Sequence, residues 1–239
     1  MQRYFIENKY FNDNLIKITN NDFHHMKHVM RYKLGDQVVV VNYDKEVFLT
    51  KIIEFNKKDC LLEIIDEIKL EDNHFDLTIA QSLIKKDHFE LVLQKTTELG
   101  VSKIIPLHTK RSIIKIDDFA KKKQRYETIV KEASEQSERI SLPIVSNMMS
   151  IKDIDYSIYD LVFVCYARNN ETDKLSEYLI NANKNTKVLF FIGPEGGFTK
   201  DELEYLDDKS QFISLGKTIL RSETAAIYIA SVYRYVMEN

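Results

Sequence analysis

Residues 188–200 read Val188-Leu189-Phe190-Phe191-Ile192-Gly193-Pro194-Glu195-Gly196-Gly197-Phe198-Thr199-Lys200, and their order indicates the class of fold. The first five residues are a continuous apolar run, which is typical of a strand buried on both faces of a sheet. Glycine and proline then end the strand, and a helix is predicted at 200–206. A buried strand that passes through a turn into a helix is a unit of an α/β fold.

The glycines indicate where this fold binds a ligand. The chain has 6 glycines, of which Gly193, Gly196 and Gly197 follow one predicted strand and Gly216 follows another. Glycine lets a backbone approach a ligand closely, and loops beyond the carboxyl ends of parallel strands are where α/β sheets bind ligands. The two loops therefore predict one pocket, although the first could also be an ordinary strand-to-helix turn. Neither loop matches GxxxxGK[ST] or GxGxxG, so phosphate binding is not specifically indicated.

Strands and helices alternate on both sides of this stretch. The predicted strands span 76–81, 103–107, a short segment near Ile144, 160–166, 188–192 and 212–215. The predicted helices span 86–99, 118–138, 173–180, 200–206 and 222–236. This alternation predicts an open, largely parallel sheet with helices on both faces, in a domain that we assign to residues 74–239.

Residues 1–70 have a different pattern and are predicted to form a small β-barrel domain. Five short apolar runs, at 4–6, 15–18, 37–41, 47–53 and 60–65, are separated by polar turns, with one helix at Asp22–Arg31. Short strands at this spacing favour a barrel. The polar residues Glu71-Asp72-Asn73 are taken as the boundary. Tyr4 and Phe5 are interpreted as core residues rather than as base-stacking residues.

Composition narrows the class of protein. The chain is 44% hydrophobic and 30% charged, with a net charge of -3, which is an ordinary globular balance. It has no apolar run of about 18 residues and no signal peptide, so a cytoplasmic protein is expected. Cys60 and Cys165 stand far apart without clustered histidines, so both are interpreted as buried strand residues and no metal is predicted. Residues 83–140 carry 13 Lys and Arg against 9 Asp and Glu, which permits RNA binding.

The second glycine loop leads into the last predicted helix through three polar residues. Ser222 is predicted to be the N-cap, and Glu223 in the first turn favours the helix dipole. Arg221 has no such structural explanation. Beside a pocket its guanidinium could hold a phosphate or carboxylate with two hydrogen bonds, although it could also be a solvated loop residue.

These two loops resemble those of the RsmE-type 16S ribosomal RNA uracil-N3 methyltransferases of the SPOUT superfamily. The resemblance rests on residues 192–197 and 215–225 and extends upstream, so that it covers nearly the whole chain. The upstream elements are Gln94-Lys95-Thr96-Thr97-Glu98-Leu99-Gly100-Val101, Glu132-Ala133-Ser134-Glu135-Gln136-Ser137, and His28-Val29-Met30-Arg31 with Lys33-Leu34-Gly35-Asp36.

The resemblance implies the rest of the architecture and the methyl donor. A PUA-like barrel is expected to precede a SPOUT α/β domain whose C-terminal segment forms a trefoil knot, and the protein is expected to be a homodimer. S-adenosylmethionine is expected to bind between the two loops. The implied donor-binding residues are Ile192, Gly193, Pro194, Glu195, Gly196, Gly197, Ser214, Leu215, Gly216, Ile219 and Leu220.

The implied reaction methylates N3 of one uridine in 16S ribosomal RNA. Because N3 carries a proton, a base must remove it or a cation must stabilise the anion. Arg221 is the candidate for the anion or a phosphate, and Glu223, with Glu195 as an alternative, is the candidate base. The candidates for contact with RNA phosphates are Arg3, Arg31, Lys110, Arg111 and Arg139.

The sequence departs from the family pattern at a few positions. Glu138 and Asn42-Tyr43-Asp44 stand where the family often has glycine, and Thr218 follows Lys217 where a second basic residue is common. Two other functions stay open. The protein could be a SPOUT enzyme that acts on another ribosomal RNA base or on transfer RNA, or a noncatalytic RNA-binding protein.

Overall fold

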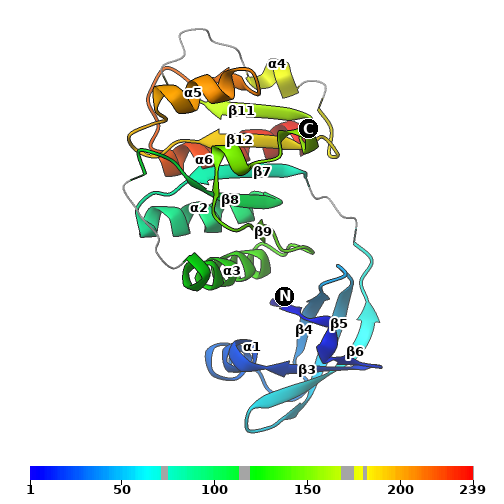
Figure 1. Ribbon diagram of the computed structural model, residues 1–239. Helices are drawn as coiled ribbons and strands as arrows, with labels where there is room; N and C mark the ends of the chain where they lie inside the picture. Colours follow the sequence, from blue (N-terminus) through cyan, green and yellow to red (C-terminus); the bar gives the residue numbers. More distant parts are fainter. Residues whose placement is uncertain (71–74, 113–118, 168–174, 180–181, 239) are drawn as a thin grey trace. The chain divides into compact units, whose positions relative to one another are not determined.

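The computed structural model describes residues 1–70, 75–112, 119–167, 175–179 and 182–238 (Figure 1). The chain forms two compact units. The N-terminal unit comprises Met1–Asp72 and Ser134–Ser141, and the C-terminal unit comprises Asn73–Ala133 and Leu142–Asn239. The predicted boundary at Glu71-Asp72-Asn73 lies outside the described residues.

The N-terminal unit contains one curled six-stranded sheet, which is the form that the predicted barrel takes. Its order is β1-β4-β5-β6-β3-β2, with β1 parallel to β4 and the other pairs antiparallel. The strands are β1 (Arg3–Ile6), β2 (Phe11–Asn12), β3 (Leu15–Thr19), β4 (Gln37–Asn42), β5 (Val47–Phe55) and β6 (Asp59–Glu67). Alternate residues, such as Ile16 with Ile18 and Val38 with Val40, fill its core. Tyr4 and Phe5 are buried, as predicted.

The predicted single helix at Asp22–Arg31 was wrong in its form. An α-helix, α1 (Asn20–His24), changes into one turn of π-helix, η2 (His25–Val29). The change keeps Phe23 and Met26 in the core while the His25 Nδ1 atom lies 2.9 Å from the buried Tyr4 hydroxyl. A left-handed residue, Arg31, with φ 55°, follows the helical turns. The unit also holds a short 3₁₀ helix, η1 (Asn8–Tyr10).

The C-terminal unit contains a seven-stranded sheet in which every described pair of strands is parallel. The order is β10-β8-β7-β12-β11-β13, with β9 also paired to β8. The strands are β7 (Leu77–Ser82), β8 (Lys103–His108), β9 (Ile144–Val145), β10 (Met149–Ser150), β11 (Leu161–Cys165), β12 (Val188–Ile192) and β13 (Gln211–Ile213). The strand predicted to continue to Leu215 ends at Ile213, because the Ser214 hydroxyl bonds to the main chain of Gly216 and forms a turn.

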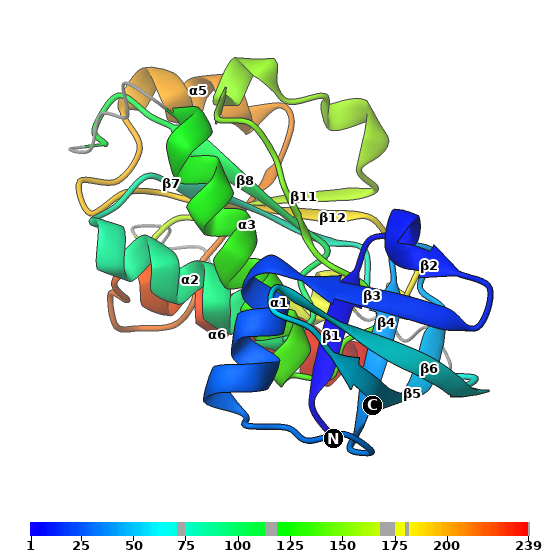
Figure 2. The ribbon, with the colours of Figure 1, turned by 90° about the horizontal axis from the view of Figure 1, so that it is seen from below.

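Helices cover both faces of this sheet, as predicted. They are α2 (Lys86–Glu98), α3 (Phe119–Gln136), α4 (Leu175–Leu179), α5 (Lys200–Asp207) and α6 (Ser222–Glu238). Along β12, Val188, Phe190 and Ile192 join the core beneath α2 and α6, whereas Leu189 and Phe191 join the core beneath α5. Figure 2 shows α2 and α6 on one side of the strands and α5 on the other.

Several helix ends differ from the prediction. The predicted first residue of α3, Asp118, and the predicted ends of α4, Asp173 and Ile180, lie outside the described residues. The helix α3 ends at Gln136 rather than Glu138. Two 3₁₀ helices, η3 (Ile151–Asp153) and η4 (Tyr156–Ile158), were not predicted. Among the described helices, none is long and apolar enough to cross a bilayer.

Candidate functional site

The two glycine loops line the same pocket in the C-terminal unit. The loops after β12 and β13 surround a cavity of about 800 Å³, together with the end of β11 and the first turns of α2 and α6. The residues predicted from sequence that line it are Gly193, Pro194, Glu195, Gly196, Gly197, Leu215, Gly216, Ile219, Leu220, Arg221 and Glu223, joined by Arg111. The strand order that brings these loops together places β11 between β12 and β13.

Two predicted donor-binding residues do not line the cavity. Ile192 is 2% exposed, and its side chain belongs to the core beneath α2 and α6. The Ser214 hydroxyl is bound to the main chain of Gly216. Leu215 and Leu220 pack against the core and supply apolar wall, whereas Ile219 is 77% exposed.

The glycines of the pocket have two different roles. Gly197 and Gly216 have φ values of 68° and 124°, and a Cβ atom on either would meet nothing within 4 Å. They therefore shape the loops and leave the cavity open. Gly193 and Gly196 are closely packed instead. A Cβ atom on Gly193 would lie 3.2 Å from the Phe198 ring, and one on Gly196 would lie 3.3 Å from Cβ of Arg111.

Ser222 joins three elements rather than capping its helix, which corrects the prediction. It is the first residue of α6. Its hydroxyl donates a hydrogen bond of 2.6 Å to the Gly193 carbonyl and accepts one of 2.8 Å from Nε2 of Gln81. Gln81 is fully buried at the end of β7, and Ser222 is 8% exposed. These two hydrogen bonds, one buried and one partly buried, connect β7, the first glycine loop and α6.

The two candidate catalytic residues have contrasting surroundings. Arg221 is exposed, and its side chain makes no hydrogen bond or ion pair with any residue that the structure describes. Glu223 is 8% exposed, and its Oε1 atom lies 3.6 Å from Nδ1 of His88. Both residues line the pocket, and the exposed Lys85 lines it beside His88. The pocket thus holds a free guanidinium and a shielded carboxylate that is paired with an imidazole.

The five candidate RNA contacts are divided between the two units. Arg3, Arg31 and Arg139 belong to the N-terminal unit, whereas Lys110 and Arg111 belong to the C-terminal unit.

Arg3 is only 6% exposed, and its Nη1 atom donates to the carbonyls of Glu138 and Arg139, the latter at 2.8 Å. Burial lowers the pKa of Arg3, while the nearby Glu138 carboxylate opposes that shift. A guanidinium enclosed in this way offers little surface to an RNA phosphate, so the burial of Arg3 disfavours the predicted RNA contact.

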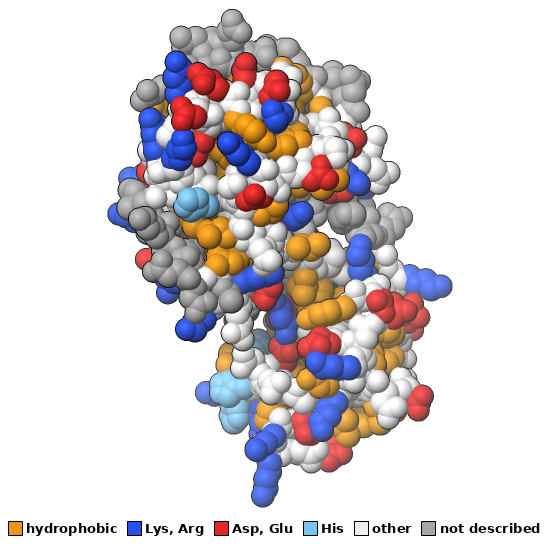
Figure 3. Space-filling model, viewed as in Figure 1, with side chains coloured by type: hydrophobic (Ala, Val, Ile, Leu, Met, Phe, Trp, Pro, Cys, Tyr) orange, Lys and Arg blue, Asp and Glu red, His pale blue; other side chains and the backbone are white. Residues whose placement is uncertain are grey.

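The other basic residues differ in their exposure to solvent and in their hydrogen-bond partners. Arg31 is exposed, and Arg139 is partly buried, with Nε bound to the Ser141 carbonyl at 3.1 Å. Lys110 pairs with Asp201 at 2.6 Å. Arg111 donates from Nη1 to the carbonyls of Gly196 at 3.0 Å and Phe198 at 3.1 Å. On the face seen in Figure 3, basic and acidic side chains are intermixed.

Sequence reasoning missed several residues of the pocket. Cys165 and Tyr166 line it from the end of β11. Cys165 was predicted to be a buried strand residue, but it is partly exposed in the pocket, and burial of its thiol raises its pKa. The only available signal was that a predicted strand ended there. His88 carried no signal of its own, because its proximity to Glu223 depends on how α2 and α6 pack. Among the described residues, no group of His, Cys, Asp and Glu could hold a metal ion.

Comparison with known proteins assigns the chain to a protein family. Residues 71–234 match the model of an RNA methyltransferase domain, and residues 18–65 match that of an RNA methyltransferase PUA domain. The ribosomal RNA small subunit methyltransferase E of Bacillus subtilis is 33% identical over 100% of this chain and 98% of its own length. That of Rickettsia conorii is 33% identical over 94% of this chain and 91% of its own.

A solved structure agrees with these matches. The ribosomal RNA small subunit methyltransferase E of Neisseria gonorrhoeae bound to S-adenosylmethionine superposes with a TM-score of 0.85 and 25% identity, over 99% of this chain and 98% of that one. The predicted order of a PUA-like domain followed by an α/β RNA methyltransferase domain is therefore confirmed, while its SPOUT-type trefoil knot stays a prediction. From the two glycine loops, their shared pocket and these matches, we conclude that the chain belongs to the ribosomal RNA small subunit methyltransferase E family.

Proposed function

We propose that this protein transfers a methyl group from S-adenosylmethionine to N3 of one uridine in the 16S RNA of the small ribosomal subunit. The observation that carries the proposal is that two loops far apart in the sequence, 193–198 and 215–221, line one pocket that also contains a shielded carboxylate and a free guanidinium. Relatives named for ribosomal RNA small subunit methylation support the substrate. With such a substrate, the protein would act in the cytoplasm.

The pocket suits the proposed donor in size and chemistry. A cavity of about 800 Å³ lies within the range of small-molecule sites. Gly197 and Gly216 leave its wall open, so main-chain groups can reach a ligand. Leu215 and Leu220 offer an apolar surface for a flat adenine ring, and the cation of Lys85 can attract the carboxylate of the donor. When bound, S-adenosylmethionine would supply an electrophilic methyl group on a sulfonium.

The side chains of the pocket can accept the proton from N3 and stabilise the anion that results. Glu223 is the proposed proton acceptor, since its carboxylate lines the pocket and is shielded from water. His88, 3.6 Å away, is proposed to hold that carboxylate in position. Arg221 is proposed to stabilise the negative charge that develops on the uracil ring, or to hold a neighbouring phosphate. Glu195, the alternative base, also lines the pocket but is exposed.

The chemistry also restricts the form of the RNA. N3 lies on the Watson–Crick edge, so the target uridine must be unpaired or extruded before it can react. We propose that Arg31, exposed on the N-terminal unit, and Arg139 contribute to binding the surrounding RNA.

We also propose that the active form is a homodimer. Large hydrophobic side chains are exposed on α2 and α6, two helices that contact each other, and these are Leu91, Tyr228 and Tyr235. Light scattering of the purified protein tests this, and a monomer that is also fully active would contradict it. A Tyr235→Lys variant, which places a charge on the same face, should dissociate the dimer.

The proposed reaction is tested by nucleoside mass spectrometry. Purified protein and S-adenosylmethionine are incubated with 16S RNA, with assembled small subunits and with transfer RNA, all from a strain that lacks the protein. We expect 3-methyluridine in the 16S RNA of at least one ribosomal substrate and no methylation of transfer RNA. A different methylated base, or methylated transfer RNA, would favour another SPOUT reaction. Donor binding without transfer to any of these substrates would favour a noncatalytic RNA-binding protein.

A further inference from the structure

The four residues after β8, Thr109–Ser112, form a tight turn whose side chains and main chain are fastened to the first glycine loop and to α5. The Ser112 N–H donates to the Thr109 carbonyl at 3.1 Å, and the two hydroxyls lie 2.8 Å apart. Thr109 is 2% exposed, so the turn is anchored at its start. The two basic residues at its tip, Lys110 and Arg111, contact α5 and the first glycine loop.

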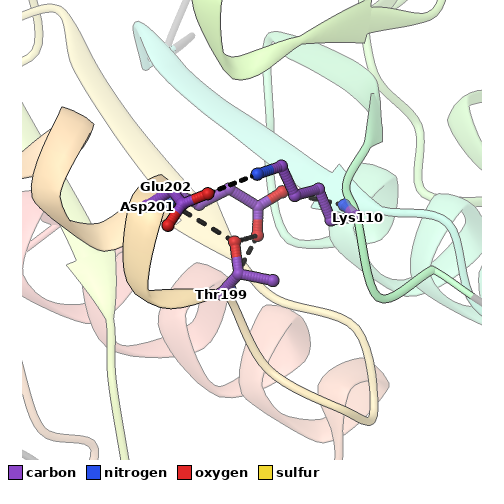
Figure 4. Close-up of polar contacts among 4 residues, drawn as sticks. All are labelled: Lys110, Thr199, Asp201 and Glu202. Carbon is purple, nitrogen blue, oxygen red and sulfur yellow. Dashed lines mark hydrogen bonds and ion pairs between the residues drawn. The ribbon is translucent and has the colours of Figure 1, made fainter.

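Lys110 fastens the turn to the first residues of α5 (Figure 4). Its N–H donates to Oε1 of Glu202 at 2.8 Å, and its Nζ atom lies 2.6 Å from the Asp201 carboxylate. The other oxygen of Glu202, Oε2, accepts from the N–H and the hydroxyl of Thr199 at 2.7 and 2.9 Å. One carboxylate therefore completes the capping box of α5 and also holds the main chain of the turn.

Arg111 reaches the glycine loop itself. Its Nη1 atom donates to the carbonyls of Gly196 and Phe198 at 3.0 and 3.1 Å. These carbonyls flank Gly197, the residue with φ 68°. A glycine at such a position has wide conformational freedom. Two hydrogen bonds from a single nitrogen restrict the peptide that precedes Gly197 and the peptide that follows Phe198.

The lack of a side chain at Gly196 is part of the same arrangement. A Cβ atom there would lie 3.3 Å from Cβ and 3.5 Å from Cδ of Arg111. Because residue 196 has no side chain, the aliphatic part of the Arg111 side chain can pack against the loop. The loop and the arginine fit each other, and Arg111 itself lines the pocket.

We propose that Thr109–Ser112 is a clamp that holds the first glycine loop in the form that binds the methyl donor, with Arg111 as the positioning residue and Lys110, Asp201 and Glu202 as its anchor. This proposal rests on the proposed function, because it assigns the clamp to the donor site. It gives Lys110 and Arg111 a role in donor affinity instead of the contact with RNA phosphates predicted from the sequence. It also explains why two adjacent cations point to carbonyl and carboxylate oxygens of their own chain.

Calorimetry with S-adenosylmethionine tests the clamp. For Arg111→Met we expect the dissociation constant to rise about tenfold, since two hydrogen bonds to the loop are lost. Arg111→Lys should recover part of the affinity, because an ammonium group can still donate to a carbonyl. Gly196→Ala should weaken donor binding in the same direction by displacing the arginine. The matched control is Lys200→Met, which removes an exposed cation from the same helix end and should leave the dissociation constant unchanged.

Kinetics and RNA binding separate the clamp from an RNA contact. In Arg111→Met the KM for the donor should rise, while kcat at saturating donor, the KM for RNA and the salt dependence of RNA binding are retained. Unchanged donor affinity with weaker, less salt-dependent RNA binding would overturn the proposal and restore the phosphate contact. Circular dichroism of each variant checks the fold. Glu202→Gln retains a residue type that can complete the capping box of α5, but it weakens the contact with Lys110 and should therefore also weaken donor binding. Failure of the unaltered protein to bind the donor would contradict the proposed function itself.

Discussion

Glu138 occupies a backbone position that favours glycine. Its φ is 56°, and the N–H of the next residue, Arg139, donates to the carbonyl of Ser134 at 3.0 Å. This is the hydrogen bond of a Schellman motif, in which the helix α3 ends and a left-handed residue follows. The family resemblance of the sequence leads us to expect glycine at the position of Glu138. The structure gives the physical reason, because a residue with a Cβ atom is strained in this conformation.

We therefore expect Glu138→Gly to stabilise the fold. Relief of the left-handed strain should raise the free energy of unfolding by about 1 kcal/mol, after the entropy that glycine gains in the unfolded chain is subtracted. Urea denaturation measures the change. The carbonyl of residue 138, which accepts from Arg3, is retained in the variant.

Glu138→Ala is the control for this substitution. It removes the same carboxylate, which lies 3.5 Å from the N-terminal amine, but leaves the Cβ atom in place. The alanine variant should therefore be no more stable than the original protein. Equal stability of the glycine and alanine variants would show that backbone strain at this residue is negligible.

The two cysteines are expected to be unreactive at neutral pH. Burial raises the pKa of Cys60 to about 12 from an ordinary value of 9.0, and burial also raises the pKa of Cys165. The thiolate is the reactive form, so raised pKa values suppress alkylation. Because the folded state holds these protons more tightly than the unfolded state, the resulting stabilisation is present below pH 9 and is lost as the pH rises toward 12.

Alkylation with iodoacetamide at pH 8, followed by mass spectrometry, measures this prediction. Modification should be slow in the folded protein and fast in urea. S-adenosylmethionine should slow it further at Cys165, which lines the pocket, and not at Cys60, which is in the core of the N-terminal unit. Rapid labelling of folded Cys165 at pH 8 would contradict the raised pKa.

Single residues were predicted from the sequence where local geometry determines their role. The glycines of the two loops and the buried Tyr4 follow from strand patterns and turn chemistry alone. The contacts of Ser222, Arg3 and Arg111 could not be predicted in this way, because their partners, Gly193, Glu138 and Gly196, are distant in the sequence. A polar residue at a helix start suggests a cap, and an arginine in a loop suggests a phosphate contact, until its partner is known.

At the scale of elements, the start of α6 connects the sheet to the first glycine loop. Ser222 donates to Gly193 in a partly buried hydrogen bond and accepts from Gln81 in a fully buried one. The Nε2 atom of Gln81 also donates to the Ser82 carbonyl at 2.9 Å, which fixes the amide from β7. The helix therefore sets the position of the loop through one hydroxyl.

Ser222→Ala should consequently weaken both the fold and the donor site. It leaves one N–H of the buried Gln81 and the partly buried Gly193 carbonyl without this partner, which costs about 1–3 kcal/mol of the free energy of unfolding. Urea denaturation and calorimetry with S-adenosylmethionine measure the two effects. Ser222→Thr retains the hydroxyl and should retain most of the donor affinity. An alanine variant with unchanged donor affinity would show that the loop is held without this bond.

Elements were predicted with unequal success for a physical reason. Each long strand of the C-terminal unit was found, because its apolar run is buried on both faces by helices. Three short elements were not predicted, namely the two-residue strands β2 and β10 and the π-turn at His25–Val29. Such short elements are stabilised by contacts with residues distant in the sequence, and the local pattern of apolar residues does not reveal these contacts.

At the scale of the whole molecule, the two units have separate cores. The core around Tyr4 and Ile52 contains only residues of the N-terminal unit, and the two cores on the faces of the parallel sheet contain only residues of the C-terminal unit. All residues that line the pocket, and the clamp that holds its loop, also belong to the C-terminal unit. Stability of the first unit and donor affinity should therefore be separable.

Arg3→Met tests this separation. The variant keeps an apolar stem but leaves the carbonyls of Glu138 and Arg139 without their donor, all within the N-terminal unit. We expect a loss of about 1–3 kcal/mol in the free energy of unfolding and no change in the dissociation constant for S-adenosylmethionine. Arg31→Met, at an exposed arginine of the same unit, should do the opposite, with unchanged stability and weaker, less salt-dependent RNA binding. Weaker donor binding in Arg3→Met at a temperature where it stays folded would show that the two units are coupled.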